Sequence, residues 1–321
     1  MRELAGKVAV VTGAASGIGR ALALRFAAEG MTLMLADVDH GGLAETAAYA
    51  REAARSWAAA QTPAAADTRA AGRRGSAGSG SAGSGLAGSG LAGWADGRAA
   101  GEVRTQITDV SDAAAVAHLA DRCFGELGAV HVLCNNAGVY QGGHMWTRTE
   151  EDFAWLLGVN LWGVLHGIRA FVPRMIEQDV EGHVVNTVSV AGLSAAPGSG
   201  GYAVSKHAAL AASLALAQDL AAADAKLRVT ALCPGAVRTR IADSARVRPP
   251  TLATTPGPDE LDAREHVSRR AERGIDPAEV AELAVAAIRE ERFLVLTDAA
   301  HAARLHRQYE VLLRGGLPLQ R

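Results

Sequence analysis

The sequence predicts an α/β fold, with a doubly wound parallel sheet covered by helices on both faces in three layers, as a single domain. Three observations support this prediction. Strand-like runs alternate with helical patterns, the strand-like runs are almost continuously apolar, and a glycine turn joins the first strand to the first helix. Continuous apolar runs are typical of parallel strands that are buried on both faces. Right-handed crossovers between them make the doubly wound sheet the simplest topology.

The elements can be assigned in order along the chain. The predicted strands cover 7–12, 32–37, 102–109, 130–138, 182–189, 227–235 and 293–298. The predicted helices begin after the glycine turn, near Gly42 and near Ser111, and then cover about 150–178, 202–223 and the segment from Asp276. Asp276 is expected to be the N-cap of that last helix, with Pro277 at its first position. The tail, 298–321, is expected to be helical and to dock on another subunit.

A glycine-rich segment interrupts this order. Residues 83–93 read GSGLAGSGLAG and fit the dinucleotide-binding pattern G-x-G-x-x-G twice. That pattern holds a phosphate only where it joins a strand to the start of a helix, and the flanks here contain neither. From Ala77 the segment repeats every five residues, as flexible linkers do. We interpret 55–101 as a Gly/Ala/Ser-rich flexible insertion, whose Ala-rich start can prolong the preceding helix.

The bulk properties restrict the class of protein. The chain has 321 residues, a mass of 33.0 kDa and 49% hydrophobic residues, which is enough for one large domain. A net charge of −2 gives no basic field for a nucleic acid. The three cysteines show no metal-ligand spacing and are interpreted as core residues in a reducing compartment. No apolar run approaches the roughly 20 residues that span a bilayer, so we expect a cytoplasmic protein without membrane contact.

The glycine turn after the first strand has the right context for a phosphate. Gly13, Gly17 and Gly19 form a G-x-x-x-G-x-G spacing between an apolar strand and an amphipathic helix, with Ser16 and Ile18 between them. Glycines allow a tight turn and let the backbone approach a pyrophosphate closely. On this motif alone, an ordinary strand-to-helix turn is the alternative.

Asp37 ends the second predicted strand, about 20 residues after the glycine turn. A carboxylate at this position can accept hydrogen bonds from both hydroxyls of an adenosine ribose, and it repels a 2′-phosphate. Ser16 in the turn and Val38 after the strand offer no positive charge to neutralise that phosphate. We therefore expect NAD as cofactor, with NADP less favoured. The alternative is an aspartate that only caps a turn.

Tyr202 and Lys206 are four residues apart in a predicted helix, and therefore on one helix face. A phenol has a pKa near ~10, and a nearby ammonium lowers it by stabilising the phenolate. Tyr202 could then exchange a proton with a substrate oxygen while hydride moves at the adjacent carbon. A surface Tyr–Lys pair on an amphipathic helix is the alternative for an isolated motif.

Taken together and in order, the motifs resemble the short-chain dehydrogenase/reductase family. They are GAASGIG, Asp37, TDV at 108–110, NNAG at 135–138, VNLWG around Asn160, NTVSVAG around Ser189, YAVSK and CPGAVRT from Cys233. The resemblance covers 7–239 apart from the insertion, and also 276–297. It implies a Rossmann-type oxidoreductase that moves hydride between NAD and a secondary alcohol or ketone. Members of this family are commonly homodimers or homotetramers through two long central helices.

The resemblance also implies roles for individual residues. Tyr202 would be the general acid/base, Lys206 would lower its pKa and bind the nicotinamide ribose, and Ser189 would hold the reacting oxygen. Asn160 would bind a water that links the lysine to solvent, although an asparagine bonded to backbone inside a helix is the alternative. No metal is needed. The residues expected around the cofactor are Gly13, Ser16, Gly17, Ile18, Gly19, Asp37, Asp109, Val110, Asn136, Ala137, Gly138, Tyr202, Lys206, Pro234, Gly235, Val237 and Thr239.

The substrate side is less defined. The segment 236–275 follows the last glycine turn at the carboxyl edge of the sheet, which makes it a candidate substrate lid. Tyr140, Gln141, Trp146 and the segment 191–199 are expected to line the pocket. Four arginines of this segment could favour an acidic substrate or could simply be solvated: Arg238, Arg240, Arg246 and Arg248.

Two other functions remain open at this stage. One is an NADPH-dependent ketoreductase acting on an acyl or polyketide-like carbonyl. The other, more distant, is a cofactor-binding protein without turnover, which typically lacks the tyrosine or the lysine. Both residues are present here.

Overall fold

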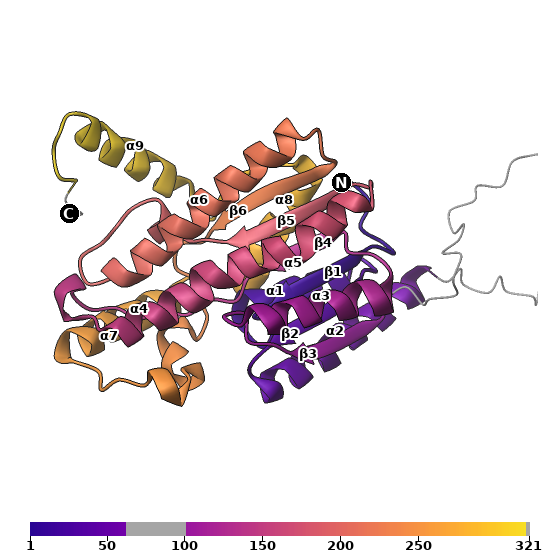
Figure 1. Cartoon of the computed structure of the whole chain (residues 1–321), viewed down its shortest axis with the longest axis horizontal. Helices are drawn as coiled ribbons and strands as arrows, with labels where there is room; N and C mark the ends of the chain where they lie inside the picture. Colours follow the sequence, from indigo (N-terminus) through magenta and orange to yellow (C-terminus); the bar gives the residue numbers. More distant parts are fainter. Residues whose placement is uncertain (62–100, 319–321) are drawn as a thin grey trace, which may run out of the picture.

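The computed structural model describes residues 1–61 and 101–318, and in them it confirms the predicted fold class. A seven-stranded parallel sheet has the strand order β3-β2-β1-β4-β5-β6-β7 (Figure 1). The strands are β1 Val8–Thr12, β2 Thr32–Asp37, β3 Val103–Ile107, β4 Val132–Asn135, β5 Gly182–Thr187, β6 Leu227–Cys233 and β7 Leu294–Leu296. Most of the predicted insertion, 62–100, and the end of the tail, 319–321, lie outside the described residues.

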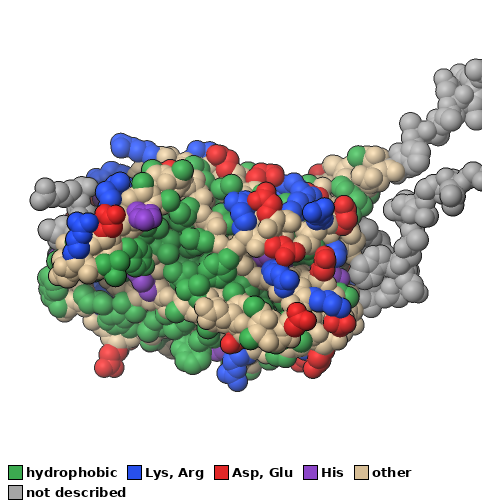
Figure 2. All heavy atoms as spheres, turned by 90° about the horizontal axis from the view of Figure 1, so that it is seen from above, with side chains coloured by type: hydrophobic (Ala, Val, Ile, Leu, Met, Phe, Trp, Pro, Cys, Tyr) green, Lys and Arg blue, Asp and Glu red, His purple; other side chains and the backbone are tan. Residues whose placement is uncertain are grey.

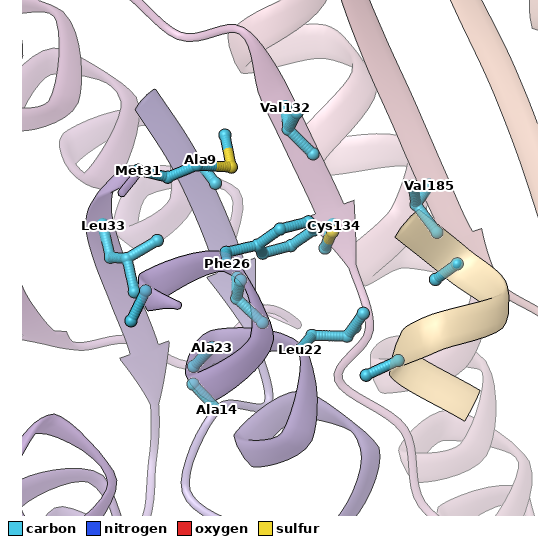
Figure 3. Close-up of a cluster of buried hydrophobic side chains, with 14 of the residues drawn as sticks. Ala9, Ala14, Leu22, Ala23, Phe26, Met31, Leu33, Val132, Cys134 and Val185 are labelled. Atoms are coloured by element: carbon cyan, nitrogen blue, oxygen red, sulfur yellow. The ribbon is translucent and has the colours of Figure 1, made fainter. Parts of the chain in front are cut away.

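One face of the sheet is covered by α1 (Gly17–Ala27), α2 (His40–Gln61) and α8 (Pro277–Glu290). Figure 3 shows Phe26 and Leu22 of α1 between the strands and α8, close to Cys134 of β4. Phe26 is fully buried, and complete burial of such a side chain stabilises the fold by roughly 1.5 to 3 kcal/mol. This packing fixes the start of α1 at the carboxyl end of β1. All three cysteines are buried, as expected.

The opposite face is covered by α3 (Ala113–Leu127), α5 (Gly163–Glu177) and α6 (Gly200–Ala222). Helix α5 continues α4 (Glu150–Leu157) through a π-helical turn, Gly158–Trp162. The expectation that no run approaches membrane-spanning length is corrected here, because the composite helix Glu150–Glu177 is long and apolar enough. Half of its apolar window is buried inside the protein, as in a helix that covers a sheet.

Capping residues explain where the last helices begin. The Asp276 carboxylate accepts a hydrogen bond from the Ala278 N–H at 2.9 Å, and Glu279 completes a capping box. Pro277 occupies the first turn, as the sequence predicts. In the tail, Asp298 caps α9 (Ala299–Leu313).

The segment 236–275 carries two 3-10 helices, Ile241–Val247 and Pro250–Leu252, followed by α7 (Pro258–Glu272). Buried charges connect it to the loop after β4. The Arg148 guanidinium, with only 4% of its side chain exposed, lies 2.7 Å from Glu260 and 3.2 Å from Asp259 of α7. Asp152 lies 2.9 Å from Arg248 and 3.4 Å from Arg148. The segment is therefore attached to the fold through a desolvated network of charges.

We expect Asp152→Asn to lower the free energy of unfolding by about 3 kcal/mol, because it leaves two buried guanidinium groups without their shared partner. Burial raises the pKa of the Asp152 carboxyl, but hydrogen bonds beginning with that from Gln141 outweigh this and hold the pKa below its usual range. Since the pKa is lowered on folding, this contribution is present above the unfolded value near ~3.9 and is lost as pH falls further. Urea denaturation at pH 7 and at about pH 3, below the unfolded value, measures both effects.

The control is Asp121→Asn, which removes a surface ion pair with Arg174 in which the aspartate side chain is 73% exposed. Exposed pairs contribute little to stability. An equal loss in both variants at pH 7 would contradict the special role of the buried network.

Candidate active site

The ends of β1, β4 and β5 are tied together by hydrogen bonds at the point where the strand order reverses. The Thr12 hydroxyl accepts from the N–H groups of Asn136 (3.0 Å) and Ala137 (3.2 Å). The Asn136 amide donates to the Thr12 carbonyl at 3.0 Å and accepts from the Thr187 hydroxyl at 3.0 Å. Ligands of such sheets bind at this edge and at this reversal. The bonds hold 136–138 beside the glycine turn.

The glycine turn leaves a space that side chains would fill. Gly13 and Gly17 have φ of +66° and +55°, a left-handed conformation that favours glycine. A Cβ on Gly13 would lie 2.7 Å from the Cα of Ala137, and one on Gly19 would lie 2.0 Å from the Gly13 carbonyl oxygen. The start of α1, at Ser16 and Gly17, lines a cavity. Unpaired N–H groups at a helix N-terminus suit a pyrophosphate, so this backbone fits a dinucleotide.

We expect Gly19→Ala to lower the melting temperature and to weaken NADH binding strongly. The added methyl group must displace the Gly13 backbone, and overpacking of this kind costs about 1 to 3 kcal/mol. Thermal unfolding and a fluorescence titration with NADH measure the two effects.

The matched control is Gly125→Ala in α3, where a Cβ would meet nothing within 4 Å. Alanine favours a helix interior over glycine, so this variant should be at least as stable as the wild type and should bind NADH equally. Identical melting temperatures in the two variants would contradict the close packing described at Gly19.

Asp37 lies at the end of β2 and lines the cavity. One carboxylate oxygen accepts from the Ala15 N–H at 2.8 Å and the other from the Asp39 N–H at 2.9 Å. The aspartate therefore does cap a turn, and each ionised oxygen keeps further acceptor capacity. No basic residue is close to Asp37 along the sequence, but the fold brings an arginine to the same part of the cavity. Arg240, which also lines the cavity, lies 3.8 Å from Asp39.

Ser189, Tyr202 and Lys206 meet at the far end of the same cavity. Tyr202 and Lys206 are in the first turns of α6, and Ser189 follows β5. Desolvation raises the pKa of Tyr202 to about 12, and a hydrogen bond with Ser189 opposes this rise. Burial lowers the pKa of Lys206 to about 8.

The Lys206 ammonium lies near the Tyr202 ring and hydrogen-bonds to the backbone of β5. It donates to the Thr187 carbonyl at 2.9 Å and lies 5.8 Å from the centre of the Tyr202 ring. Because burial dominates, the Tyr202 pKa is above the usual phenol value and not below it. The lysine is held near the tyrosine by the end of β5.

Asn160 is fully buried in the π-helical turn. Its Oδ1 accepts from the Val139 N–H at 2.9 Å, and its Nδ2 donates to the Val139 carbonyl and the Ser205 hydroxyl, each at 2.9 Å. Both amide donors are thus used within the protein. A Cβ on Gly138 would lie 3.3 Å from the Lys206 Nζ and 3.4 Å from the Asn160 Oδ1, so the glycine leaves these two side chains close together.

The cavity has a volume of about 680 Å³ and runs along the carboxyl edge of the sheet. Such a volume is typical of a ligand site. The sequence-predicted residues that line it are Gly13, Ser16, Gly17, Ile18, Asp37, Asp109, Val110, Asn136, Ala137, Gly138, Ser189, Tyr202, Lys206, Pro234, Gly235, Val237 and Thr239. Gly19 and Asn160 do not line it but pack directly behind it.

Comparison with known proteins agrees with this geometry. A sequence model of the short chain dehydrogenase family matches residues 7–72 and 93–249. The chain belongs to the short-chain dehydrogenase family. Among relatives of this short-chain dehydrogenase is 1-deoxy-11-beta-hydroxypentalenate dehydrogenase of Streptomyces avermitilis, 34% identical over 237 residues, or 72% of this chain and 68% of that protein.

Solved structures show the same fold. A short-chain dehydrogenase/reductase from Burkholderia phymatum in complex with NAD is 37% identical, with a TM-score of 0.82 over 100% of this chain and 99% of that one. Levodione reductase is 26% identical, with a TM-score of 0.68 over 93% and 98% of the two chains. This short-chain dehydrogenase is therefore an oxidoreductase with a site for a nicotinamide cofactor.

Some expectations for the substrate end of the short-chain dehydrogenase were wrong. Tyr140 and most of 191–199 line the cavity, but Gln141 is buried and donates to Asp152 at 2.7 Å. Trp146 has 82% of its surface exposed and stacks on His144. Among the lining residues that were missed are His301 and Arg304 of α9. Only the fold of the chain's end brings them here, and no sequence motif marks them.

Proposed function

We propose that the protein transfers hydride between NAD and a secondary alcohol or ketone, with Tyr202 as the general acid/base. The observation that carries this proposal is one continuous cavity with the glycine turn and Asp37 at one end and Ser189, Tyr202 and Lys206 at the other. The name of the Streptomyces relative, a dehydrogenase of a hydroxylated compound, supports the reaction type.

The residues present fit a dinucleotide: the glycine turn and the start of α1 would hold the pyrophosphate, Asp37 the adenosine ribose, and Lys206 the nicotinamide ribose. When bound, the cofactor supplies or accepts the hydride. Ser189 and Tyr202, which line the same end of the cavity, orient the substrate oxygen between their two hydroxyl groups. With its pKa raised to about 12, Tyr202 carries a proton at neutral pH and can donate it to a ketone oxygen.

In the direction of alcohol oxidation, Tyr202 first releases its own proton to solvent and then, as the phenolate, accepts the hydroxyl proton of the substrate. Because burial lowers the pKa of Lys206 to about 8, this lysine gains and loses a proton close to physiological pH. Its ammonium lies close to Gly138 and Asn160, between Tyr202 and the π-helical turn. Asn160 fixes the loop that carries Val139 through two hydrogen bonds and is tied to Ser205 of α6 by a third, and thereby positions the wall of the site.

NAD is proposed over NADP because the Asp37 carboxylate faces the cavity where a 2′-phosphate would be bound. Arg240 is the observation that favours the alternative, an NADPH-dependent ketoreductase, because its guanidinium lies near the same position. Asp39 already engages this arginine, so the net charge beside the ribose stays negative.

We further propose that 236–275 acts as a substrate lid and that the protein is a homodimer or homotetramer. Exposed apolar side chains support an assembly through α5 and α6, namely Val204, Leu214 and, just before α5, Trp162. Figure 2 shows a face on which hydrophobic side chains gather over a broad area. On α9, Leu312 and Leu313 are exposed as well.

The test is a pair of fluorescence titrations with NADH and NADPH, followed by a screen of secondary alcohols and ketones at the nicotinamide absorbance band. We expect tighter binding of NADH and turnover of at least one alcohol–ketone pair. Tighter binding of NADPH would favour the ketoreductase, and cofactor binding without any turnover would favour a non-catalytic protein.

A further inference from the structure

The substrate end of the cavity carries arginines that have no carboxylate partner. Arg246 and Arg270 both line the cavity, and within 1–61 and 101–318 no carboxylate lies at ion-pair distance from either. Most other arginines of the 236–275 segment are paired with an acid. Arg238, Arg248 and Arg264 are paired with Asp276, Asp152 and Asp243 at 2.8, 2.9 and 3.1 Å.

The acids at this end do not balance the arginines. Asp259 is occupied by Arg148, by the Thr147 hydroxyl and by the His144 N–H, and these contacts lower its pKa to about 2. Asp262 is the other acid of α7 that lines the cavity. The same end of the cavity is lined by Arg246, Arg270 and also Arg304 of α9. The substrate end therefore has a positive surplus.

The charge of Arg270 reaches the interior of the site. Burial raises the pKa of Tyr140 to about 12, and the charge of Arg270 opposes this rise. The Tyr140 ring lies edge-on to the Tyr202 ring, with 5.1 Å between their centres. The guanidinium of Arg270 thus acts on the wall next to the proposed general acid/base.

The remaining walls are apolar. Val139 and Trp155 form a buried cluster against which Val247 and Leu252 of the 236–275 segment pack, and all four line the cavity. A ligand that packs against these walls and also pairs with the arginines must combine an apolar body with an anionic group. The arginines are needed because an anion that leaves water without a charged partner is strongly unfavourable.

We propose that the substrate is an alcohol or ketone with an apolar body and a carboxylate, and that Arg270, assisted by Arg246, binds this carboxylate. The proposal rests on the proposed function and adds a substrate class to it. A guanidinium holds a carboxylate through two parallel hydrogen bonds, which would orient the apolar body toward Tyr202.

The kinetic test compares 4-hydroxycyclohexanecarboxylate with its neutral primary amide as substrates under saturating NAD. We expect the wild type to prefer the acid, and Arg270→Met to raise the KM of the acid by about 10- to 100-fold while leaving the amide unaffected. Arg270→Lys should restore part of the preference. Equal use of acid and amide by the wild type, or an unchanged preference in Arg270→Met, would overturn the proposal.

The matched control is Arg273→Met. Arg273 follows α7 directly and is exposed like Arg270, but it does not line the cavity. This variant should keep the preference of the wild type. Loss of the preference in both variants would indicate a general charge effect and would also overturn the assignment.

A binding experiment separates the substrate class from the reaction itself. Calorimetry on the NADH-loaded protein compares adamantane-1-carboxylate with adamantane-1-carboxamide. Tighter binding of the carboxylate to the wild type, lost in Arg270→Met, supports the anion site even if no alcohol is turned over. Equal binding, or binding of neither compound, contradicts the anion site without affecting the proposed hydride transfer.

Discussion

Tyr202→Phe should lower kcat by about 10²- to 10⁴-fold while the affinity for NADH stays within a factor of two. The substitution removes the hydroxyl that exchanges a proton with the substrate oxygen and leaves the ring that packs against Tyr140. The glycine turn and Asp37, at the other end of the cavity, are unaffected. Initial rates with an alcohol–ketone pair found in the screen, together with an NADH titration, measure both quantities.

Tyr140→Phe is the comparison variant, because it removes the neighbouring phenol from the same cavity. Its kcat should fall far less than that of Tyr202→Phe, since the Tyr140 hydroxyl has no assigned proton transfer. If the two variants lost kcat equally, or if Tyr202→Phe kept the wild-type value, Tyr202 would not be the general acid/base.

Asp37→Asn should reduce the preference for NADH over NADPH by about 100-fold, with weaker NADH binding and stronger NADPH binding each contributing about tenfold. The charge that repels a 2′-phosphate is removed, while Arg240, which lines the same cavity, remains. The asparagine oxygen can still accept one of the backbone bonds now made to Ala15 and Asp39, so the turn should persist. Titrations with both cofactors test this.

Asp112→Asn controls for the loss of one negative charge. Asp112 caps α3 through the Ala114 N–H at 2.8 Å, does not line the cavity, and can be replaced by asparagine as a cap. An unchanged ratio of NADH to NADPH affinity in Asp37→Asn, or an equal change in Asp112→Asn, would mean that Asp37 does not bind the adenosine ribose.

The alternation of strand-like runs with helical patterns was sufficient to predict the sheet. Parallel strands that are buried on both faces are continuously apolar in sequence, as Val8–Thr12 is. The glycine turn was predictable for a related reason. Left-handed φ values and close backbone contacts at Gly13 and Gly17 admit almost no other residue, so the local structure is visible in the sequence.

Features that depend on contacts between distant segments could not be predicted. The burial that raises the pKa of Tyr202 and the position of Lys206 against the Thr187 carbonyl both depend on how α6 meets the end of β5. Arg148 and Gln141 are ordinary loop residues in the sequence, yet both are drawn into a buried network around Asp152. Trp146 was expected to line the pocket, but it is exposed and lies outside the cavity lining.

The central claim, hydride transfer at a carbinol carbon, is tested most directly by isotope transfer. The wild type would be incubated with NAD and a secondary alcohol carrying deuterium at the carbinol carbon, and the reduced cofactor analysed by mass spectrometry. We expect one deuterium per molecule of NADH formed, and none above background with Tyr202→Phe over the same time. Formation of NADH without deuterium, or transfer at the wild-type rate in the variant, would contradict the proposed function.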